Sequence, residues 1–373
     1  MYLRRRKMQS MTTENKNYCV ILAGGMGRRL WPVSRERLPK QFIDFFGVGR
    51  TQLQQTFDRF ARLLPANHIF VSTNEDYAAL IREQLPELPE QNVLLEPIFR
   101  NTAPSVAWAC YRISHLCADA RIIVTPSDHA VVNEDAFAED VERGFDFVSG
   151  RDGMLTLGVK PTRPEPGYGY VQLGEEVQHG EVFRIKSFTE KPEREFARLF
   201  MESGEFYWNT GIFFFNVTYM IKSLKELLPD VMRRIDYEGA DVSWEEELEY
   251  VRKNFPRYPN LSIDHGILER LQDVYVMRGD FGWADLGTWH SAFEAMSTSA
   301  DDNVVIDSEV MIEESKGNII KIPHDHLAVI NGLEGYIVAE QGNVLFICKK
   351  EDSSALVRKY INEVKLKYGE GFV

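Results

Sequence analysis

The sequence is poor in cysteine, in net positive charge and in long apolar runs. Its four cysteines among 373 residues form no CxxC pair, which argues against a zinc ribbon or a dithiol redox motif and favours a reducing compartment such as the cytoplasm. Because nucleic-acid-binding proteins present a basic surface, the net charge of -13 argues against a nucleic-acid partner. No apolar run approaches the length of a membrane span, and the basic start of the chain lacks the apolar core of a signal peptide, so we expect no membrane partner.

The bulk composition is that of an ordinary folded protein, with 44% hydrophobic and 27% charged residues. In the first half of the chain, short apolar runs alternate with amphipathic stretches, which favours βαβ units and a mostly parallel sheet. The expected strands cover residues 18–23, 68–72, 92–95, 121–125 and 154–159. The expected helices cover residues 51–64, 74–85, 101–118, 133–149, 219–229, 244–254 and 263–271.

This pattern predicts three segments. Residues 1–17 are polar and basic and predict a disordered leader. Residues 18–300 predict an α/β domain of Rossmann-like type with a mostly parallel mixed sheet, which includes a β-rich lobe over about 167–217. Residues 301–373 contain short β-prone runs split by Gly, Asn and Asp, and predict a small C-terminal all-β unit that ends in a helix over 352–367.

A glycine-rich loop follows the first expected strand, in the stretch VILAGGMGRRLWPVSRERLPKQF (residues 20–42). Its three glycines let the backbone approach a ligand closely and aim N–H groups at it. Arg29 and Lys40 can neutralise phosphate charge there, and Arg35 is a weaker candidate. The spacing fails the P-loop pattern and lacks the third glycine of the dinucleotide fingerprint. The sequence therefore predicts a phosphate-binding loop of another type.

The same stretch closely resembles the signature of the sugar-1-phosphate nucleotidyltransferases, and within that family the mannose-1-phosphate guanylyltransferases, also called GDP-mannose pyrophosphorylases. Six further motifs continue the resemblance in order: EPIFRNTAPS, TPSDH, FTEKP, WNTGIFFF, SIDHGILE and GWADLGTW. Arg28 falls where the family usually has a small or hydroxylic residue. The resemblance implies that the C-terminal part is a short left-handed β-helix, although no crisp hexapeptide period is visible after residue 301.

The implied reaction joins GTP and mannose 1-phosphate to give GDP-mannose and pyrophosphate. Because an oxygen of the sugar phosphate attacks the α-phosphorus in line, charge neutralisation and alignment are the main tasks. Asp128 ends the strand of RIIVTPSD, and Asp285 lies in an expected Gly-rich turn of GWADLG. Taken alone, each aspartate is better explained as a turn or cap residue. In the family the matching aspartates hold the metal, and Mg²⁺, for which Mn²⁺ can substitute, suits two carboxylates completed by water and phosphate oxygens.

The resemblance also assigns the other site residues by motif. Arg29 is placed on the outgoing pyrophosphate, Lys40 on the nucleotide phosphates and Lys191 on the phosphate of the sugar. The nucleotide is expected to contact Leu22, Ala23, Gly24, Gly25, Gly27, Glu96, Asn101 and Thr102. The sugar is expected to contact Gly169, Glu190, Asn209 and Asp264.

Three of these assignments have a chemical argument or a simpler explanation. A carboxylate can accept hydrogen bonds from both N1–H and N2–H₂ of guanine, which makes Glu96 the candidate that recognises the base. Asn101 can also be explained as the N-cap of the helix that follows it, and a place at a helix N-terminus explains Asp264 nearly as well as a sugar contact does.

Several alternatives stay open at this point. Another sugar 1-phosphate, of fucose, heptose or glucose, can replace mannose 1-phosphate. A catalytically silent paralogue that senses sugar nucleotides would be expected to lose an aspartate, a lysine or the glycine loop, and all of these are present. A dinucleotide-dependent oxidoreductase would need the missing glycine. Some family members carry a further isomerase domain, and a chain that ends at residue 373 is expected to have transferase activity alone. The oligomeric state stays open, a homo-oligomer included.

Overall fold

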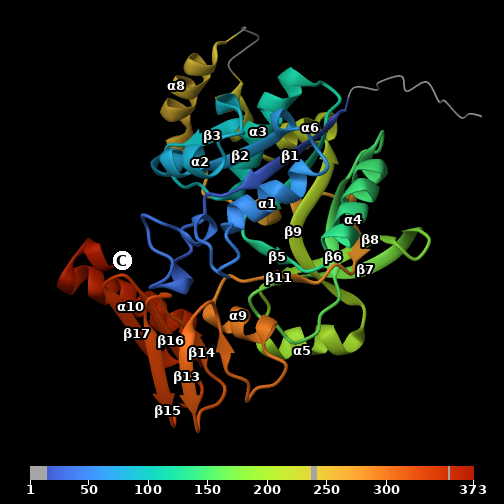
Figure 1. Cartoon of the computed structure of the whole chain (residues 1–373). Coiled ribbons are helices and arrows are strands. Elements are labelled where there is room, and N and C mark those ends of the chain that lie inside the picture. The colour runs from blue at the N-terminus through green and yellow to red at the C-terminus, as the bar shows by residue number, and fades with distance from the viewer. Residues whose placement is uncertain (1–14, 237–241, 352) are drawn as a thin grey trace, which may run out of the picture.

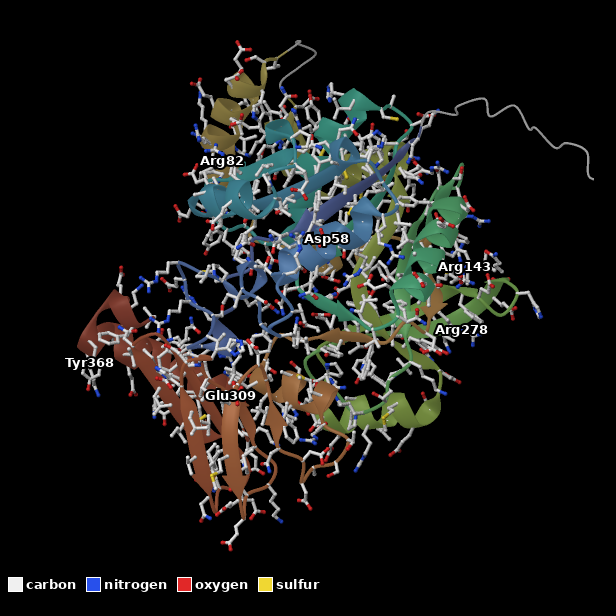
Figure 2. All side chains as sticks on the ribbon, viewed as in Figure 1. Asp58, Arg82, Arg143, Arg278, Glu309 and Tyr368 are labelled. Carbon is white, nitrogen blue, oxygen red and sulfur yellow. The ribbon has the colours of Figure 1, made fainter. Side chains whose placement is uncertain are left out.

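The computed structural model describes residues 15–236, 242–351 and 353–373. Residues 1–14 of the predicted leader therefore lie outside the described residues. The last residue of that leader, Asn17, is the first residue of strand β1 (Asn17–Leu22). Within the described ranges, no helix has both the length and the apolar character needed to cross a bilayer. Charged side chains such as Arg82, Arg143 and Arg278 project from the surface of the molecule (Figure 2).

The centre of the molecule is a mixed sheet, for which the described residues supply nine strands in the order β3-β2-β1-β4-β9-β6-β10-β8-β7. Strands β8 and β9 run opposite to the others, so the predicted mostly parallel mixed sheet is confirmed. The strands after β1 are β2 (Ile69–Asn74), β3 (Val93–Glu96), β4 (Arg121–Pro126), β6 (Met154–Val159), β7 (Gly169–Gln178), β8 (Val182–Glu190), β9 (Phe206–Asn216) and β10 (Val274–Gly279).

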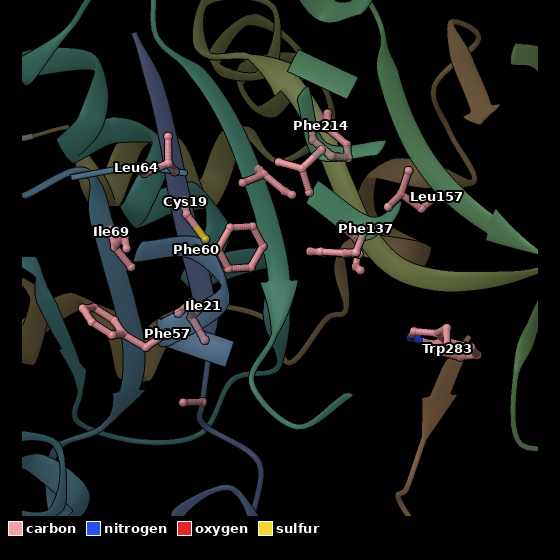
Figure 3. Close-up of a cluster of buried hydrophobic side chains, with 14 of the residues drawn as sticks. Cys19, Ile21, Phe57, Phe60, Leu64, Ile69, Phe137, Leu157, Phe214 and Trp283 are labelled. Atoms are coloured by element: carbon pink, nitrogen blue, oxygen red, sulfur yellow. The ribbon is translucent and has the colours of Figure 1, made fainter. Parts of the chain in front are cut away.

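Helices cover both faces of this sheet (Figure 1). On one face, Phe57 and Phe60 of α1 and Phe137 of α4 pack with Cys19 and Ile21 of β1 in a continuous apolar core (Figure 3). Helices α1 (Gln52–Ala61), α2 (Ala78–Gln84) and α4 (Glu134–Val148) lie on this face. Helices α3 (Thr102–Leu116), α6 (Val217–Leu227), α7 (Pro229–Ile235) and α8 (Trp244–Asn254) lie on the other.

Two helical predictions need correction. The expected helix at 263–271 is only a short π-helical segment, Asp264–Leu268, whose glycine packs closely on Leu261. The expected helix at 219–229 ends at Leu227, and a separate helix, α7, starts at Pro229. A proline at the first helical position explains this break, because proline begins a helix readily but cannot continue one.

The order of strands puts a topological switch point at β1. Strands β2 and β3 follow on one side of β1, whereas β4 pairs on its other side. In open α/β sheets, ligands bind at the carboxyl ends of the strands beside such a point. The glycine loop leaves the end of β1, and Asp128 follows the end of β4, so both lie at this edge.

The C-terminal unit is a stack of parallel strands. One ladder joins β12 (Val304–Val305), β14 (Ile319–Lys321) and β16 (Tyr336–Gln341), and a second joins β13 (Glu309–Glu313) and β15 (Leu327–Asn331). A third parallel contact joins Lys316 and Glu334. The partners Ile319–Ile337, Val310–Ala328 and Lys316–Glu334 are each 18 residues apart in sequence, which is the arrangement of a parallel β-helix with three sides. The left hand that the family resemblance implies stays a prediction.

The β-helix closes with an antiparallel strand, β17 (Val344–Lys349), and helix α10 (Ser353–Tyr368). These elements lie against the segment that follows the glycine loop (Figure 1). Leu30, Trp31 and Val33 share one apolar core with Ile319 and Ile337 of the β-helix. The C-terminal unit thus supports the loop from the side opposite the sheet.

Candidate active site

The glycine loop presents bare backbone at the end of β1. Leu22 is half-buried and ends the strand, and the N–H of Ala23 continues the pairing by donating to the carbonyl of Ser72 at 2.7 Å. A Cβ atom added to Gly24 or Gly25 would meet no atom within 4 Å. The packing of the protein therefore does not explain these two glycines, whereas a ligand lying against the backbone would.

Gly27 has a different role from its neighbours. Its φ is 59°, in the left-handed region that favours glycine, and an added Cβ would lie 2.5 Å from Oγ of Ser34 and 3.0 Å from Cγ of Lys40. A side chain at this position would therefore displace Lys40. Gly27 keeps space for the lysine that the sequence assigned to the nucleotide phosphates.

Lys40 lies between the two aspartates that were expected to bind metal. Its Nζ is 2.6 Å from Oδ2 of Asp128 and 3.6 Å from Oδ1 of Asp285, and only 8% of its side chain is exposed. Arg29 lies close by, since its Nη2 and Oδ1 of Asp285 both come within 3.0 Å of a Cβ added to Gly287. Two carboxylates and two cations, from three separate segments of the chain, therefore meet at one point.

The charges in this cluster stabilise one another. Burial alone would raise the pKa of Asp285, but the positive charges of Lys40 and Arg29 hold it below its ordinary value. Burial alone would lower the pKa of Lys40, but Asp128 and Asp285 raise it above its ordinary value. Both groups are therefore charged at neutral pH.

A two-stranded ladder outside the main sheet brings the aspartates together. Strand β5 (His129–Val131) pairs antiparallel with β11 (Trp283–Asp285), and Asp285 lies opposite His129. The sequence placed Asp285 in a Gly-rich turn, which is wrong, because it ends this short strand. The indole N–H of Trp283 donates to Nδ1 of His129 at 3.1 Å, and burial lowers the pKa of His129, so the imidazole is neutral.

The two carboxylates suit a divalent cation. Both lie within 4 Å of the same ammonium nitrogen, so one cation can contact both. Magnesium in proteins usually takes one or two carboxylates and completes its shell with water and phosphate oxygens. Among the residues that the structure describes, no group of three or more His, Cys, Asp and Glu side chains forms a metal-binding cluster. The geometry of Asp128 and Asp285 is compatible with a divalent cation held by this pair of carboxylates.

The residues expected to bind the sugar meet where β7, β8 and β9 lie side by side. Gly169 of β7 is opposite both Glu190 of β8 and Asn209 of β9. A Cβ added to Gly169 would lie 2.6 Å from Oε2 of Glu190. The amide of Asn209 donates to Oδ1 of Asp264 at 3.2 Å, so the fourth residue joins the group.

The carboxyl of Asp264 differs from an ordinary surface carboxyl. Burial, with a smaller effect of the Glu190 charge, raises the pKa of Asp264 to about 6. Lys191 pairs with Glu190 and has a φ of 48°, which is unusual for a residue with a side chain. Because strained backbone gathers at functional sites, this conformation supports a specific role for Lys191.

Tyr168 connects the residues expected to bind the sugar with Asp285, one of the two aspartates expected to bind the metal. The sequence alone did not point to Tyr168. Its hydroxyl donates to the main-chain carbonyl of Asp285 at 3.0 Å, and its own carbonyl accepts from the N–H of Lys191 at 3.2 Å. Its ring packs edge-on against Trp208 and Trp283. The signal in the sequence was its place beside Gly169 in PGYGYV.

Glu96 is almost completely buried. It ends β3, is 3% exposed, and accepts a hydrogen bond from Oγ of Ser72 at 2.6 Å. Burial, partly offset by Ser105 and Ser72, raises the pKa of Glu96 to about 7. Its carboxyl is therefore a mixture of protonated and ionised forms at neutral pH.

The neighbours of Glu96 have structural partners. Asn101 caps α3 by accepting from the N–H of Thr102 at 3.0 Å, and its φ of 63° is unusual for a non-glycine residue. The hydroxyl of Thr102 accepts from the N–H of Ile263 at 2.8 Å, next to Asp264. This hydrogen bond connects helix α3 with the segment that contains Asp264.

Arg35 is wrong as a phosphate candidate. Its guanidinium is buried and donates to the carbonyl of Pro32 at 3.2 Å, to the carbonyl of Gln341 at 2.5 Å and to Oδ1 of Asn343 at 3.0 Å. Its partners belong to its own segment and to the C-terminal unit. Arg35 therefore connects the segment that follows the glycine loop with the C-terminal β-helix.

Comparison with known proteins fits this geometry. A family model described as nucleotidyl transferase matches residues 18–302. The chain belongs to the nucleotidyl transferase family. Two relatives named mannose-1-phosphate guanylyltransferase, from Salmonella muenchen and Escherichia coli (strain K12), are each 32% identical to this chain. The alignments cover 93% of this chain and 73% of the Salmonella protein, and 94% and 74% for the Escherichia coli protein.

A solved structure gives the same result for the fold. It is described as a mannose-1-phosphate geranyltransferase from Thermus thermophilus, is 29% identical, and superposes with a TM-score of 0.83 over 94% of this chain and 99% of that one. The predicted family and fold class are thereby confirmed, and the chain is a nucleotidyltransferase. Enzymes of this family take a nucleoside triphosphate and a sugar phosphate as substrates and generally use a divalent metal.

Proposed function

We propose that this nucleotidyltransferase transfers GMP from GTP to mannose 1-phosphate, giving GDP-mannose and pyrophosphate. A phosphate oxygen of mannose 1-phosphate forms a bond to the α-phosphorus of GTP, and the bond from that phosphorus to the bridging oxygen of pyrophosphate breaks. The main observation in support is the meeting of Lys40, Asp128, Asp285 and Arg29 at the end of the glycine loop. This set of charges suits a triphosphate rather than a neutral ligand.

On the nucleotide side, the protein aligns and neutralises phosphate groups. The open N–H groups of the glycine loop and Lys40 bind the nucleotide phosphates, and Arg29 binds the outgoing pyrophosphate. Asp128 and Asp285 would hold Mg²⁺, or Mn²⁺ in its place, and the bound metal would neutralise charge on the reacting phosphates. Because His129 is neutral, it adds no positive charge beside the metal-binding carboxylates.

On the sugar side, the protein positions the attacking phosphate. When the sugar phosphate binds, the ammonium group of Lys191 leaves the carboxylate of Glu190 and pairs with the phosphate. The Glu190 carboxylate is then free to accept a hydrogen bond from a sugar hydroxyl. Asn209 and Asp264 supply a donor and an acceptor for further hydroxyls, and Gly169 lets the ring lie against the backbone. Tyr168 fixes the distance between this group and Asp285, so both substrates are held in one geometry.

The base is recognised by Glu96, with Asn101 and Thr102 beside it. An ionised carboxylate accepts from N1–H and N2–H₂ of guanine, whereas the corresponding edge of adenine offers an acceptor at N1. GTP is therefore the preferred nucleotide. The enzyme acts in the cytoplasm, where GTP is present. Residues 18–300 form its catalytic domain, and residues 301–373 form its β-helical domain.

The direct test is pyrophosphate release from each of the four ribonucleoside triphosphates with the 1-phosphates of mannose, glucose, fucose and a heptose. We expect the highest kcat/KM for GTP with mannose 1-phosphate. A higher kcat/KM with another sugar 1-phosphate would make that compound the substrate in place of mannose 1-phosphate. The absence of pyrophosphate release with every pair of substrates would refute nucleotidyl transfer.

A further inference from the structure

Gln41, the residue after Lys40, contacts the glycine loop from the inside. Its side-chain Nε2 donates to the carbonyl of Ala23 at 2.8 Å and to the carbonyl of Gly25 at 2.8 Å. The side chain is 1% exposed. Because both partners are carbonyl oxygens, the donor end of the amide must face them, and the orientation of the amide is fixed by its partners.

These two hydrogen bonds set the direction of two peptide groups. In a planar trans peptide, the C=O and the following N–H point to opposite sides. Holding the carbonyls of Ala23 and Gly25 inward therefore turns the N–H groups of Gly24 and Met26 outward. Within the described part of the chain, these two N–H groups donate to no other group, and the space beside Gly24 and Gly25 is open.

We infer that Gln41 is a positioning residue that aims the N–H groups of Gly24 and Met26 at the phosphates of the nucleotide. The hydroxyl of Thr73 also donates to the carbonyl of Ala23, at 2.9 Å, but the described residues give the carbonyl of Gly25 no hydrogen bond except that of Gln41. Without Gln41, the peptide after Gly25 is free to turn its carbonyl outward, where it would repel a phosphate. Glycine permits this rotation at little cost.

This role rests on the proposed function only in that the ligand carries phosphates. It acts on every nucleoside triphosphate alike, because the loop faces the phosphates and not the base. It also predicts no direct effect on the sugar group around Asn209.

The test compares Gln41→Leu with Gln52→Leu. Gln52 is another buried glutamine, 5% exposed, and neither of its side-chain polar atoms has a hydrogen-bond partner among the described residues. The two variants thus make the same chemical change, but only one removes donors from the loop. Calorimetry without sugar phosphate, with the nucleotide that the wild-type enzyme uses, gives the Kd, and thermal unfolding gives the Tm.

We expect the Kd of Gln41→Leu to rise about ten- to a hundred-fold, because two hydrogen bonds that direct the loop are lost, while Gln52→Leu binds as the wild type does. Gln41→Glu keeps the shape and replaces the donor, so it should also bind weakly, and its Kd should fall as the pH is lowered and the carboxyl gains a proton.

Wild-type affinity in Gln41→Leu would overturn the inference. An equal loss in Gln52→Leu would also overturn it, since the effect would then come from general loosening of the buried region. If Gln41→Leu does not fold, the affinity of Gln41→Glu for the nucleotide provides the test. Wild-type affinity of Gln41→Glu at high pH would refute the positioning role of Gln41. Failure of the wild type to prefer GTP would change the proposed function but leave this comparison intact.

Discussion

At the scale of single residues, Lys40 is the most tightly constrained charge in the site. Its ammonium contacts the two carboxylates that would hold a divalent cation, and Gly27 keeps its space free. Since a divalent cation held by Asp128 and Asp285 would draw on the same two carboxylates, the two positive charges would compete. In the proposed mechanism, Lys40 would then pair with the nucleotide phosphates instead.

The competition predicts an unusual effect of Lys40→Met. Without nucleotide, the variant should bind Mn²⁺ at least about ten-fold more tightly than the wild type, because unit charges 4 Å apart interact by about 4 kcal/mol at an effective dielectric constant of 20. Turnover should fall, because a phosphate contact is lost. Electron paramagnetic resonance of free Mn²⁺ measures the affinity, and unchanged or weaker binding would show that Lys40 does not compete with the metal.

Lys191 should act on the other substrate. Lys191→Ala removes a charge-assisted contact, on the order of 1.5–3 kcal/mol, and should raise KM for the sugar phosphate about ten- to a hundred-fold with little change in the affinity for GTP. Lys186→Ala is the matched control, since Lys186 is an exposed lysine on β8, the strand that ends just before Lys191. A loss of GTP affinity equal to the loss for the sugar phosphate would contradict the separate roles of the two lysines.

Glu96 predicts a pH-dependent stability. Its pKa is raised from 4.5 to about 7 in the folded protein, so between these values the native state binds more protons than the unfolded state and stability falls as the pH rises. Glu96→Gln lacks this ionisation. From pH 5 to pH 8 its free energy of unfolding should therefore rise relative to the wild type by on the order of 2–3 kcal/mol.

Chemical denaturation at the two pH values measures this difference, and a constant difference would refute the raised pKa. The same variant should narrow the preference for GTP over ATP, because an amide can donate to adenine N1. If the ratio of the two kcat/KM values stays unchanged, Glu96 does not recognise the base.

At the scale of elements, the structure joins segments that local sequence patterns treat as separate. The parallel half of the sheet and the position of Asp128 were predictable, because alternating apolar runs and helices dictate a parallel sheet whose strands end at one edge. The β5–β11 ladder was not predictable, since each strand has three residues and the partners lie more than a hundred residues apart. The meeting of Gly169, Glu190 and Asn209 likewise depends on the long-range register of three strands.

The role of Arg35 was missed for the same reason. Its carbonyl partner Gln341 is 306 residues away, so the sequence showed only a basic residue in a basic loop. The C-terminal β-helix was visible as short β-prone runs, but its repeat of 18 residues was hidden because one turn, from Val304 to Ile319, is three residues shorter.

The contacts of Arg35 predict that the β-helix affects catalysis. Arg35→Ala should lower the free energy of unfolding by about 2–4 kcal/mol, because it leaves buried carbonyl groups unpaired. It should also lower kcat/KM for GTP, because the segment that carries Arg29 and Lys40 loses its support. Arg37→Ala, an exposed arginine two residues further on, is the control. Equal effects of the two substitutions on stability and on kcat/KM would contradict a structural connection through Arg35.

In the whole molecule, an acidic protein brings three basic side chains to one region. The net charge is -13, yet Arg29, Lys40 and Lys191 all belong to the proposed site, where Lys40 pairs with Asp128 and Asp285, and Lys191 with Glu190. Basic groups confined to one site of an acidic chain favour small anionic substrates over polyanions. In the proposed function, the sheet supplies the nucleotide side, the β7–β9 lobe the sugar side, and the β-helix the support for the loop between them.

GTP labelled in one phosphate at a time distinguishes transfer of GMP to mannose 1-phosphate from transfer of any other part of the nucleotide. With mannose 1-phosphate and Mg²⁺, a label in the α-phosphate should appear in GDP-mannose, and a label in the γ-phosphate should appear only in pyrophosphate. Transfer of the γ-label to the sugar phosphate, or release of the α-label as free GMP, would contradict the account.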